Sequence, residues 1–151
     1  MGMTTGAGAI TFAARLLIGA LLVVAGALKV GHFDELAASI AGFRILPQQA
    51  IAPLAVLLPF LEIGVGLYLL AGLFTRAAAA LSSLLFAIYA AAIVSALLRR
   101  LPVNCGCFGP ADRAQADWPH AAMDVVLALI CVFVVLRAPG PYSIDERLRR
   151  V

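Results

Sequence analysis

Four long apolar runs dominate the sequence, and each has about the length of roughly 20 residues that a helix needs to cross a bilayer. The runs cover about residues 12–30, 51–73, 77–98 and 119–136. Hydrophobic residues make up 64% of the chain and charged residues 13%, which is too little polar surface for a water-soluble fold of this size. The sequence therefore predicts an all-α, integral membrane, antiparallel four-helix bundle, with residues 1–151 forming one domain.

The segments that flank the runs indicate how the helices connect. Phe74, Thr75 and Arg76 form a short link between the second and third runs, so these two helices are expected to be antiparallel neighbours. Pro119 suits the first turn of the fourth helix, and Pro139 ends it. Four crossings would place both termini on the same side of the membrane.

The first run could also be interpreted as a signal peptide. Arg15 precedes an apolar stretch that ends in Ala25-Gly26-Ala27, which has the small residues of a cleavage site. Cleavage there would leave three spans and put the termini on opposite sides. A retained first helix is the favoured interpretation.

The charge pattern excludes some partners. The net charge is +3, but the eleven Lys and Arg residues are scattered at the ends of the runs. No nucleic-acid partner is therefore expected. The sequence contains neither a Gly-rich phosphate loop nor the Cys/His spacing of a zinc site, so no metal is expected either.

The positive-inside rule gives no orientation, because five basic residues flank the runs on each side. On the side of the termini these are Arg76, Arg137, Arg147, Arg149 and Arg150, and on the other side Lys29, Arg44, Arg99, Arg100 and Arg113. The cysteines indicate an orientation where the basic residues do not. Cys105 and Cys107 lie in the loop of about residues 99–118, and a disulfide persists in an oxidising compartment. This loop is therefore expected outside the cytoplasm, with cytoplasmic termini and the bundle in the inner (plasma) membrane.

Glu62 lies about midway along the second run, where an acidic group costs roughly 2.5–3.5 kcal/mol near the centre of a bilayer. It could be protonated and bonded to a backbone group, or it could pair with a cation. The first helix offers one face with small residues in the middle and a cation at each end: Arg15, Gly19, Leu22, Gly26 and Lys29. The glycines would let the second helix approach closely.

The direction of the side chains favours one of the two cations. Side chains lean toward the N-terminus of their helix, so Lys29 leans into the bundle and Arg15 leans out toward its own surface. Glu62, on the antiparallel second helix, leans toward Lys29. The sequence therefore predicts a Lys29–Glu62 pair.

The fourth helix carries His120, Asp124 and Cys131 on one face, at spacings of four and seven. Asp124 could belong to a polar network or could be a first-turn acid that complements the helix dipole. His120 is expected to be solvated at the interface, and Cys131 to be a small apolar filler.

Cys105, Gly106 and Cys107 form the pattern with the clearest chemistry. Two thiols one residue apart can close only a small, strained disulfide ring, and strained disulfides suit exchange rather than bracing. Arg99 and Arg100 would favour the thiolate if they lie close. A metal role and no chemical role are the alternatives left open.

Several motifs resemble a known family of four-helix membrane proteins. Arg15-Leu-Leu-Ile-Gly19, Ala25-Gly-Ala-Leu-Lys29, Leu58-Pro-Phe-Leu-Glu-Ile-Gly64 and Gly66 resemble the DoxX family, and Cys105-Gly-Cys-Phe-Gly109 resembles its MauE branch. The resemblance implies a bundle reminiscent of vitamin K epoxide reductase and of the disulfide-bond-forming membrane enzymes. It also implies a part in methylamine utilisation, namely maturation of the disulfide-rich small subunit of methylamine dehydrogenase with a thioredoxin-like partner.

On this basis the chain is expected to be a thiol–disulfide oxidoreductase that exchanges electrons with a thioredoxin-like protein. A membrane quinone is the candidate acceptor and no cofactor is expected to be covalently bound; the ring could contact Phe60, Phe86, Tyr89 or Trp118. The alternatives are a non-catalytic membrane scaffold for a soluble oxidoreductase and a bundle that binds a small solute or lipid around Lys29 and Glu62.

Overall fold

The computed structural model describes residues 6–104, 115–138, 140 and 142–148. Within them the chain forms α1 (Gly6–Lys29), α2 (Phe33–Gly42), α3 (Gln48–Ala71), α4 (Thr75–Leu98), α5 (Trp118–Arg137) and α6 (Ile144–Leu148). Helices α1, α3, α4 and α5 are long and apolar enough to cross a membrane. The expected all-α four-helix membrane bundle is confirmed, with helix ends that differ from the predicted ones by a few residues.

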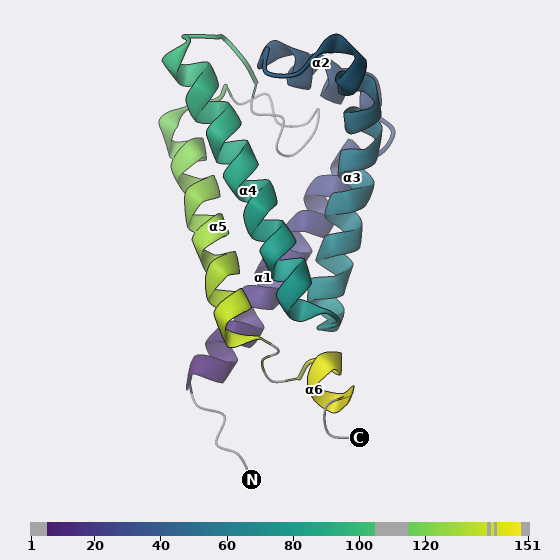
Figure 1. Cartoon of the computed structure of the whole chain (residues 1–151), viewed down its shortest axis with the longest axis vertical. Coiled ribbons are helices and arrows are strands. Elements are labelled where there is room, and N and C mark those ends of the chain that lie inside the picture. The colour runs from purple at the N-terminus through teal and green to yellow at the C-terminus, as the bar shows by residue number, and fades with distance from the viewer. Residues whose placement is uncertain (1–5, 105–114, 139, 141, 149–151) are drawn as a thin grey trace.

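The four long helices are arranged as two antiparallel pairs. Helix α1 packs along α3, and α4 packs along α5, whereas the contacts between the two pairs are fewer. In Figure 1 the pairs diverge toward one end of the molecule, and α2 lies across that end. The start of α1, the end of α5 and α6 all lie at the opposite end, as four crossings require.

Glycines bring α1 and α3 into backbone contact. A Cβ added to Gly26 would lie 2.6 Å from the Pro59 carbonyl oxygen, and one added to Gly66 would lie 2.7 Å from the Gly19 carbonyl oxygen. No larger residue fits at these positions without moving a helix. The small-residue face predicted for α1 is therefore its contact with α3, as small residues allow in membrane bundles.

The turn between α3 and α4 is tight and is capped by a distant residue. Gly72 and Phe74 both have left-handed backbone angles, with φ of 68° and 49°. The Asp145 carboxylate accepts hydrogen bonds from Phe74 N at 2.9 Å and from Thr75 N at 2.7 Å. These bonds satisfy free N–H groups at the start of α4 and place a negative charge at its positive end. They also fix α6 against the bundle.

Helix α2 lies between α1 and α3 and is not one of the four predicted helices. It has only 10 residues, which is too short to span a membrane. Its apolar residues Phe33, Leu36, Ile40 and the following Phe43 recur at spacings of three and four, which is the signal of an amphipathic helix. Leu36 is buried, and the others are partly buried.

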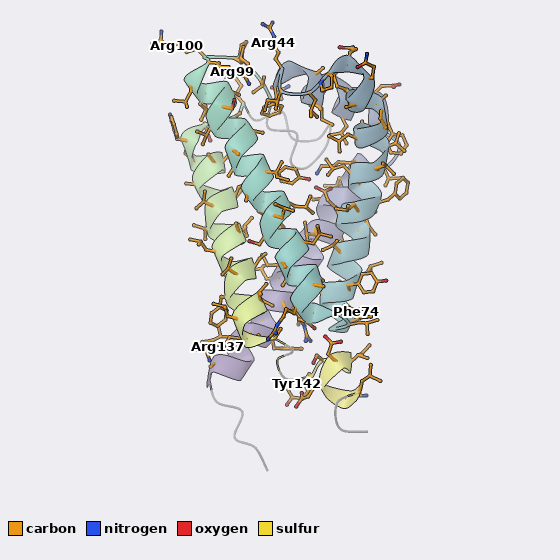
Figure 2. All side chains as sticks on the ribbon, viewed as in Figure 1. Arg44, Phe74, Arg99, Arg100, Arg137 and Tyr142 are labelled. Carbon is orange, nitrogen blue, oxygen red and sulfur yellow. The ribbon has the colours of Figure 1, made fainter. Side chains whose placement is uncertain are left out.

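The larger hydrophobic core cluster brings together residues of all four long helices. It contains Leu22, Leu69, Phe86 and Cys131, each 3% exposed or less. Cys131 thus occupies a small apolar site in the core. Figure 2 shows charged side chains at both ends of the bundle, with Arg44, Arg99 and Arg100 at the end that carries α2 and Arg137 at the other.

Candidate functional site

A buried ion pair links α1 and α3. Lys29 Nζ lies 2.7 Å from Glu62 Oε1 and 2.8 Å from Glu62 Oε2, and the two residues are 2% and 0% exposed. Lys29 is the last residue of α1, so its side chain points back into the bundle and its charge complements the helix C-terminus. The predicted pairing of Glu62 with Lys29 is present in the structure.

Tyr89 of α4 completes this centre. Its hydroxyl donates a hydrogen bond of 2.5 Å to Glu62 Oε1, and Lys29 Nζ lies 5.6 Å from the centroid of its ring. Glu62 therefore accepts three hydrogen bonds from two other helices. Such satisfaction makes a charged pair tolerable in a low-dielectric interior. No sequence pattern indicates this contact, because Tyr89 is simply an aromatic residue in the third run.

Asp124 lies on the other side of the same centre. It is 4% exposed and lines a cavity of about 20 Å³ together with Glu62, Tyr89 and Phe86. A buried water needs roughly 10–15 Å³ and at least two polar partners, so this cavity has room for one water. Asp124 Oδ2 has no hydrogen-bond partner among the residues that the structure describes.

The interpretation of Asp124 as a first-turn acid is wrong. Helix α5 begins at Trp118, and its first turn holds no acidic residue. Asp124 lies almost two turns inside the helix and faces the bundle, as does Cys131 two turns further along the same face; they are 4% and 1% exposed. The structure thus brings Lys29, Glu62, Tyr89 and Asp124 together from four helices.

Arg15 does not reach the surface as its lean predicted. It is 1% exposed, and its Nη2 donates to the Tyr142 carbonyl oxygen at 3.2 Å. The segment that leads into α6 folds over this end of α1 and covers the guanidinium. Arg15 Nε and Nη1 have no hydrogen-bond partner within the described ranges. Arg15 is therefore a second buried cation, at the opposite end of α1 from the Glu62 centre.

His120 lies at the start of α5, beside the N-cap residue. Asp117 accepts hydrogen bonds from His120 N at 2.9 Å and pairs with His120 Nδ1 at 2.6 Å. The hydrogen bond from the backbone of His120, and then that from its ring, hold the pKa of the Asp117 carboxyl below its usual range. His120 thus holds the capping residue Asp117 at the start of α5.

The four aromatic residues considered for a quinone ring lie in different surroundings. Tyr89 is partly buried in the polar centre, and Phe86 is 3% exposed in the core. Phe60 and Trp118 are 53% and 58% exposed, so they face outward from the bundle. The structure brings only Phe86 and Tyr89 of these four near each other, with ring centroids 6.5 Å apart.

Cys105 and Cys107 lie outside the described residues, but the two ends of their loop are described. Asn104 and Gln115 form an antiparallel bridge, and Ala116 N donates to the Val103 carbonyl oxygen at 2.9 Å. The loop therefore starts and returns at one point, at the end of the bundle that carries α2. Val103 is buried there and packs against Gly42 of α2.

Arg99, at the end of α4, holds the segment after α2 at the same end of the bundle. Its guanidinium donates to the carbonyl oxygens of Phe43 and Arg44, which follow α2. Its charge is thus held near the base of the cysteine loop. No group of three or more His, Cys, Asp or Glu that could hold a metal ion occurs in the described part of the chain.

The comparisons with known proteins agree with one another. The family model of methylamine utilisation protein MauE matches residues 7–137. Methylamine utilization protein MauE of Paracoccus denitrificans is 28% identical over 140 residues, which are 91% of this chain and 75% of the relative. The protein of the same name from Methylophilus methylotrophus is 30% identical over 123 residues, covering 80% of this chain and 65% of the relative. No solved structure matches.

Proposed function

The chain belongs to the family of methylamine utilisation protein MauE, and from this premise we propose that it is a membrane accessory protein that performs thiol–disulfide exchange through Cys105 and Cys107. The observation that carries the proposal is the Cys-Gly-Cys pair itself, in a family member whose four long helices hold the loop at one end of the bundle. The partner would be a thioredoxin-like oxidoreductase. By its family, the protein would support maturation of an exported protein such as methylamine dehydrogenase.

The exchange would begin when a thiolate of the pair attacks a disulfide of the partner, or when a partner thiolate attacks the strained disulfide of the pair. Either route forms a mixed disulfide that the second cysteine resolves. Both routes need an exposed pair. The described residues show the base of the loop, where Asn104 and Gln115 form an antiparallel bridge. We include in this proposal that the protein is related to DoxX-like proteins. We also include that a quinone is the electron acceptor.

Redox titration of the purified protein tests this proposal. In a Cys131→Ser background, only Cys105 and Cys107 can react with a maleimide that adds mass on a gel. Oxidised thioredoxin should remove both reactive thiols and reduced thioredoxin should restore them, because exchange is reversible. A Cys105→Ser/Cys107→Ser variant is the control. If thioredoxin of either redox state leaves both thiols unchanged, the protein acts as a scaffold for a soluble oxidoreductase instead.

The proposed orientation puts the cysteine loop outside the cytoplasm. A membrane-impermeant maleimide should label Cys105 and Cys107 in intact, reduced cells, because the loop lies at the extracytoplasmic end. In a cysteine-free background, Glu35→Cys on α2 should be labelled in the same way, whereas Tyr142→Cys should react only after lysis. Both control positions are exposed in the structure, at opposite ends of the bundle. The reverse pattern would place the loop in the cytoplasm.

A further inference from the structure

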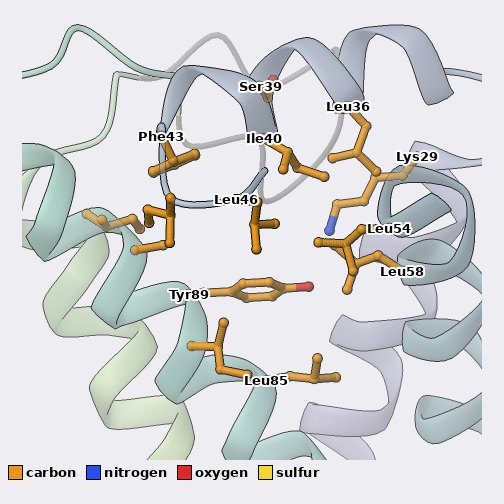
Figure 3. Close-up of a pocket in the computed structure, with 14 residues that line it drawn as sticks. Lys29, Leu36, Ser39, Ile40, Phe43, Leu46, Leu54, Leu58, Leu85 and Tyr89 are labelled. Atoms are coloured by element: carbon orange, nitrogen blue, oxygen red, sulfur yellow. The ribbon is translucent and has the colours of Figure 1, made fainter. Parts of the chain in front are cut away.

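An apolar pocket of about 330 Å³ lies where the two helix pairs diverge. Its roof is α2 and the segment after it, with Leu36, Ile40 and Phe43, and its walls are α3 and α4 (Figure 3). Pockets of this size and character hold small molecules in other proteins. The contact of Arg99 with the Phe43 and Arg44 carbonyl oxygens holds the roof in place.

The rim of the pocket faces the bilayer. Leu54 of α3 and Ile88 of α4 both line it and are 36% and 52% exposed. Both residues belong to helices that are long and apolar enough to cross a membrane, so their exposed surfaces contact acyl chains. A ligand would therefore enter from the lipid, and a long apolar tail could leave by the same opening.

The inner end of the pocket is polar. Figure 3 shows the Lys29 ammonium and the Tyr89 hydroxyl directed into the same space, and both residues line the pocket. An ammonium group has three N–H donors, and the described residues provide Lys29 Nζ with two acceptors, both on Glu62. The third N–H therefore has no acceptor among the described residues and can donate to a ligand.

The charge at this inner end selects the kind of acceptor. Glu62 neutralises Lys29 at 2.7 Å, so this pair carries no net charge, and the nearby Asp124 adds no positive charge. The centre therefore gives little attraction to a carboxylate or phosphate. A neutral carbonyl oxygen can accept the remaining hydrogen bond without adding a buried charge. A hydrocarbon chain fits the apolar walls but leaves that donor unused.

We propose that this pocket binds the head ring of a membrane quinone, with a ring carbonyl accepting a hydrogen bond from Lys29 Nζ and the tail passing between Leu54 and Ile88 into the bilayer. This inference rests on the proposed function, because it supplies the electron acceptor. Oxidation of the Cys105 and Cys107 dithiol to a disulfide breaks two S–H bonds, forms one S–S bond and releases two electrons and two protons. The quinone takes up both electrons and both protons and becomes the quinol.

Binding is tested with two matched ligands on the purified protein in detergent. Decylubiquinone has the ring carbonyls, and decylbenzene has a ring and the same tail without them. Decylubiquinone should bind roughly tenfold more tightly than decylbenzene, because only it accepts the hydrogen bond from the charged Lys29. Its binding should also raise the melting temperature by mass action. Equal affinity for the two ligands would show a site for acyl chains and overturn the proposal.

Two variants on α4 locate the site. Ala92 lines the pocket, and Ala91 is exposed on the neighbouring face of the same helix. Ala92→Phe should fill the pocket and weaken decylubiquinone binding at least tenfold, whereas Ala91→Phe should leave it unchanged. The preference for decylubiquinone over decylbenzene should disappear in the Lys29→Met/Glu62→Gln variant. Unchanged binding in Ala92→Phe would mean that the quinone binds elsewhere.

The same measurement separates this inference from the proposed exchange. Decylubiquinone should bind a Cys105→Ser/Cys107→Ser variant as tightly as the wild type, because the Lys29 and Tyr89 end of the pocket does not depend on the cysteines. If decylubiquinone binds but thioredoxin does not exchange with the cysteine pair, only the proposed function is contradicted. If thioredoxin exchanges but decylubiquinone does not bind, only the quinone site is contradicted.

Discussion

Replacing either member of the Lys29–Glu62 pair is expected to lower the free energy of unfolding in detergent by about 3–5 kcal/mol, because the remaining charge stays buried without its partner. Both residues are at most 2% exposed, so bulk water does not reach the charge that remains. Glu62→Gln keeps a carbonyl oxygen that can accept a hydrogen bond from Tyr89. The loss of stability in this variant therefore reports mainly on the unpaired charge of Lys29. Equilibrium unfolding of Glu62→Gln and Lys29→Met measures both losses.

A double-mutant cycle then tests the contact itself. Lys29→Met/Glu62→Gln removes both charges together and should recover part of the loss, with a coupling energy of about 0.5–3 kcal/mol. Simple additivity of the two single changes would contradict the contact at 2.7 Å.

Asp124→Asn provides the matched control for Glu62→Gln. It makes the same change of carboxylate to amide at a second buried acid of the same centre. Asp124 has no ion pair within the part of the chain that the structure describes, and its Oδ2 has no hydrogen-bond partner there. Neutralisation should therefore leave stability within about 0.5 kcal/mol of the wild type or raise it. An equal loss in both variants would show that burial of any acid, and not the pairing with Lys29, determines the effect.

The bundle could be predicted from hydropathy, because a span of about 20 apolar residues has few alternatives in a chain this poor in charge. The Lys29–Glu62 pair could also be predicted, since it depends on the lean of two side chains on antiparallel helices. Neither prediction depends on how the helices of the whole bundle are rotated relative to one another.

The contacts of Tyr89 and Asp124 could not be predicted, because they depend on that rotation. The sequence pattern along one helix indicates which residues point inward. It does not indicate which of the three neighbouring helices these residues contact. The burial of Arg15 and the capping of α4 by Asp145 depend instead on a short polar segment after α5 that folds back on the bundle. The sequence of this segment has no periodic pattern of hydrophobic residues that would indicate its contact with the bundle.

Helix α2 could have been found, since the spacing of Phe33, Leu36, Ile40 and Phe43 is helical. Its place over the divergence of the two pairs determines the pocket, because without this roof Lys29 and Tyr89 would lie open to the end of the bundle. A short interfacial helix thus turns a buried ion pair into one end of a binding site.

Cys107→Ser is expected to trap a mixed disulfide between Cys105 and a thioredoxin-like protein, whereas Cys105→Ser is not. Cys105 is nearer in sequence to Arg99 and Arg100, and positive charge lowers the pKa of a thiol and favours the attacking thiolate. Arg99 is held at the base of the loop by its bonds to the Phe43 and Arg44 carbonyl oxygens. Cys107 would then resolve the intermediate, so its loss stops the reaction at the adduct.

The adduct should appear on non-reducing gels of membranes from cells that express Cys107→Ser in a Cys131→Ser background, and it should disappear on reduction. Cys131 is 1% exposed in the core, so its replacement removes the third thiol without touching the loop. An adduct in Cys105→Ser alone would exchange the two roles and leave the mechanism intact. If neither variant forms an adduct and both retain wild-type function, the pair has no part in exchange. The bundle would then serve as a scaffold, with Lys29, Glu62 and the pocket under α2 as its only remaining candidate site among the described residues.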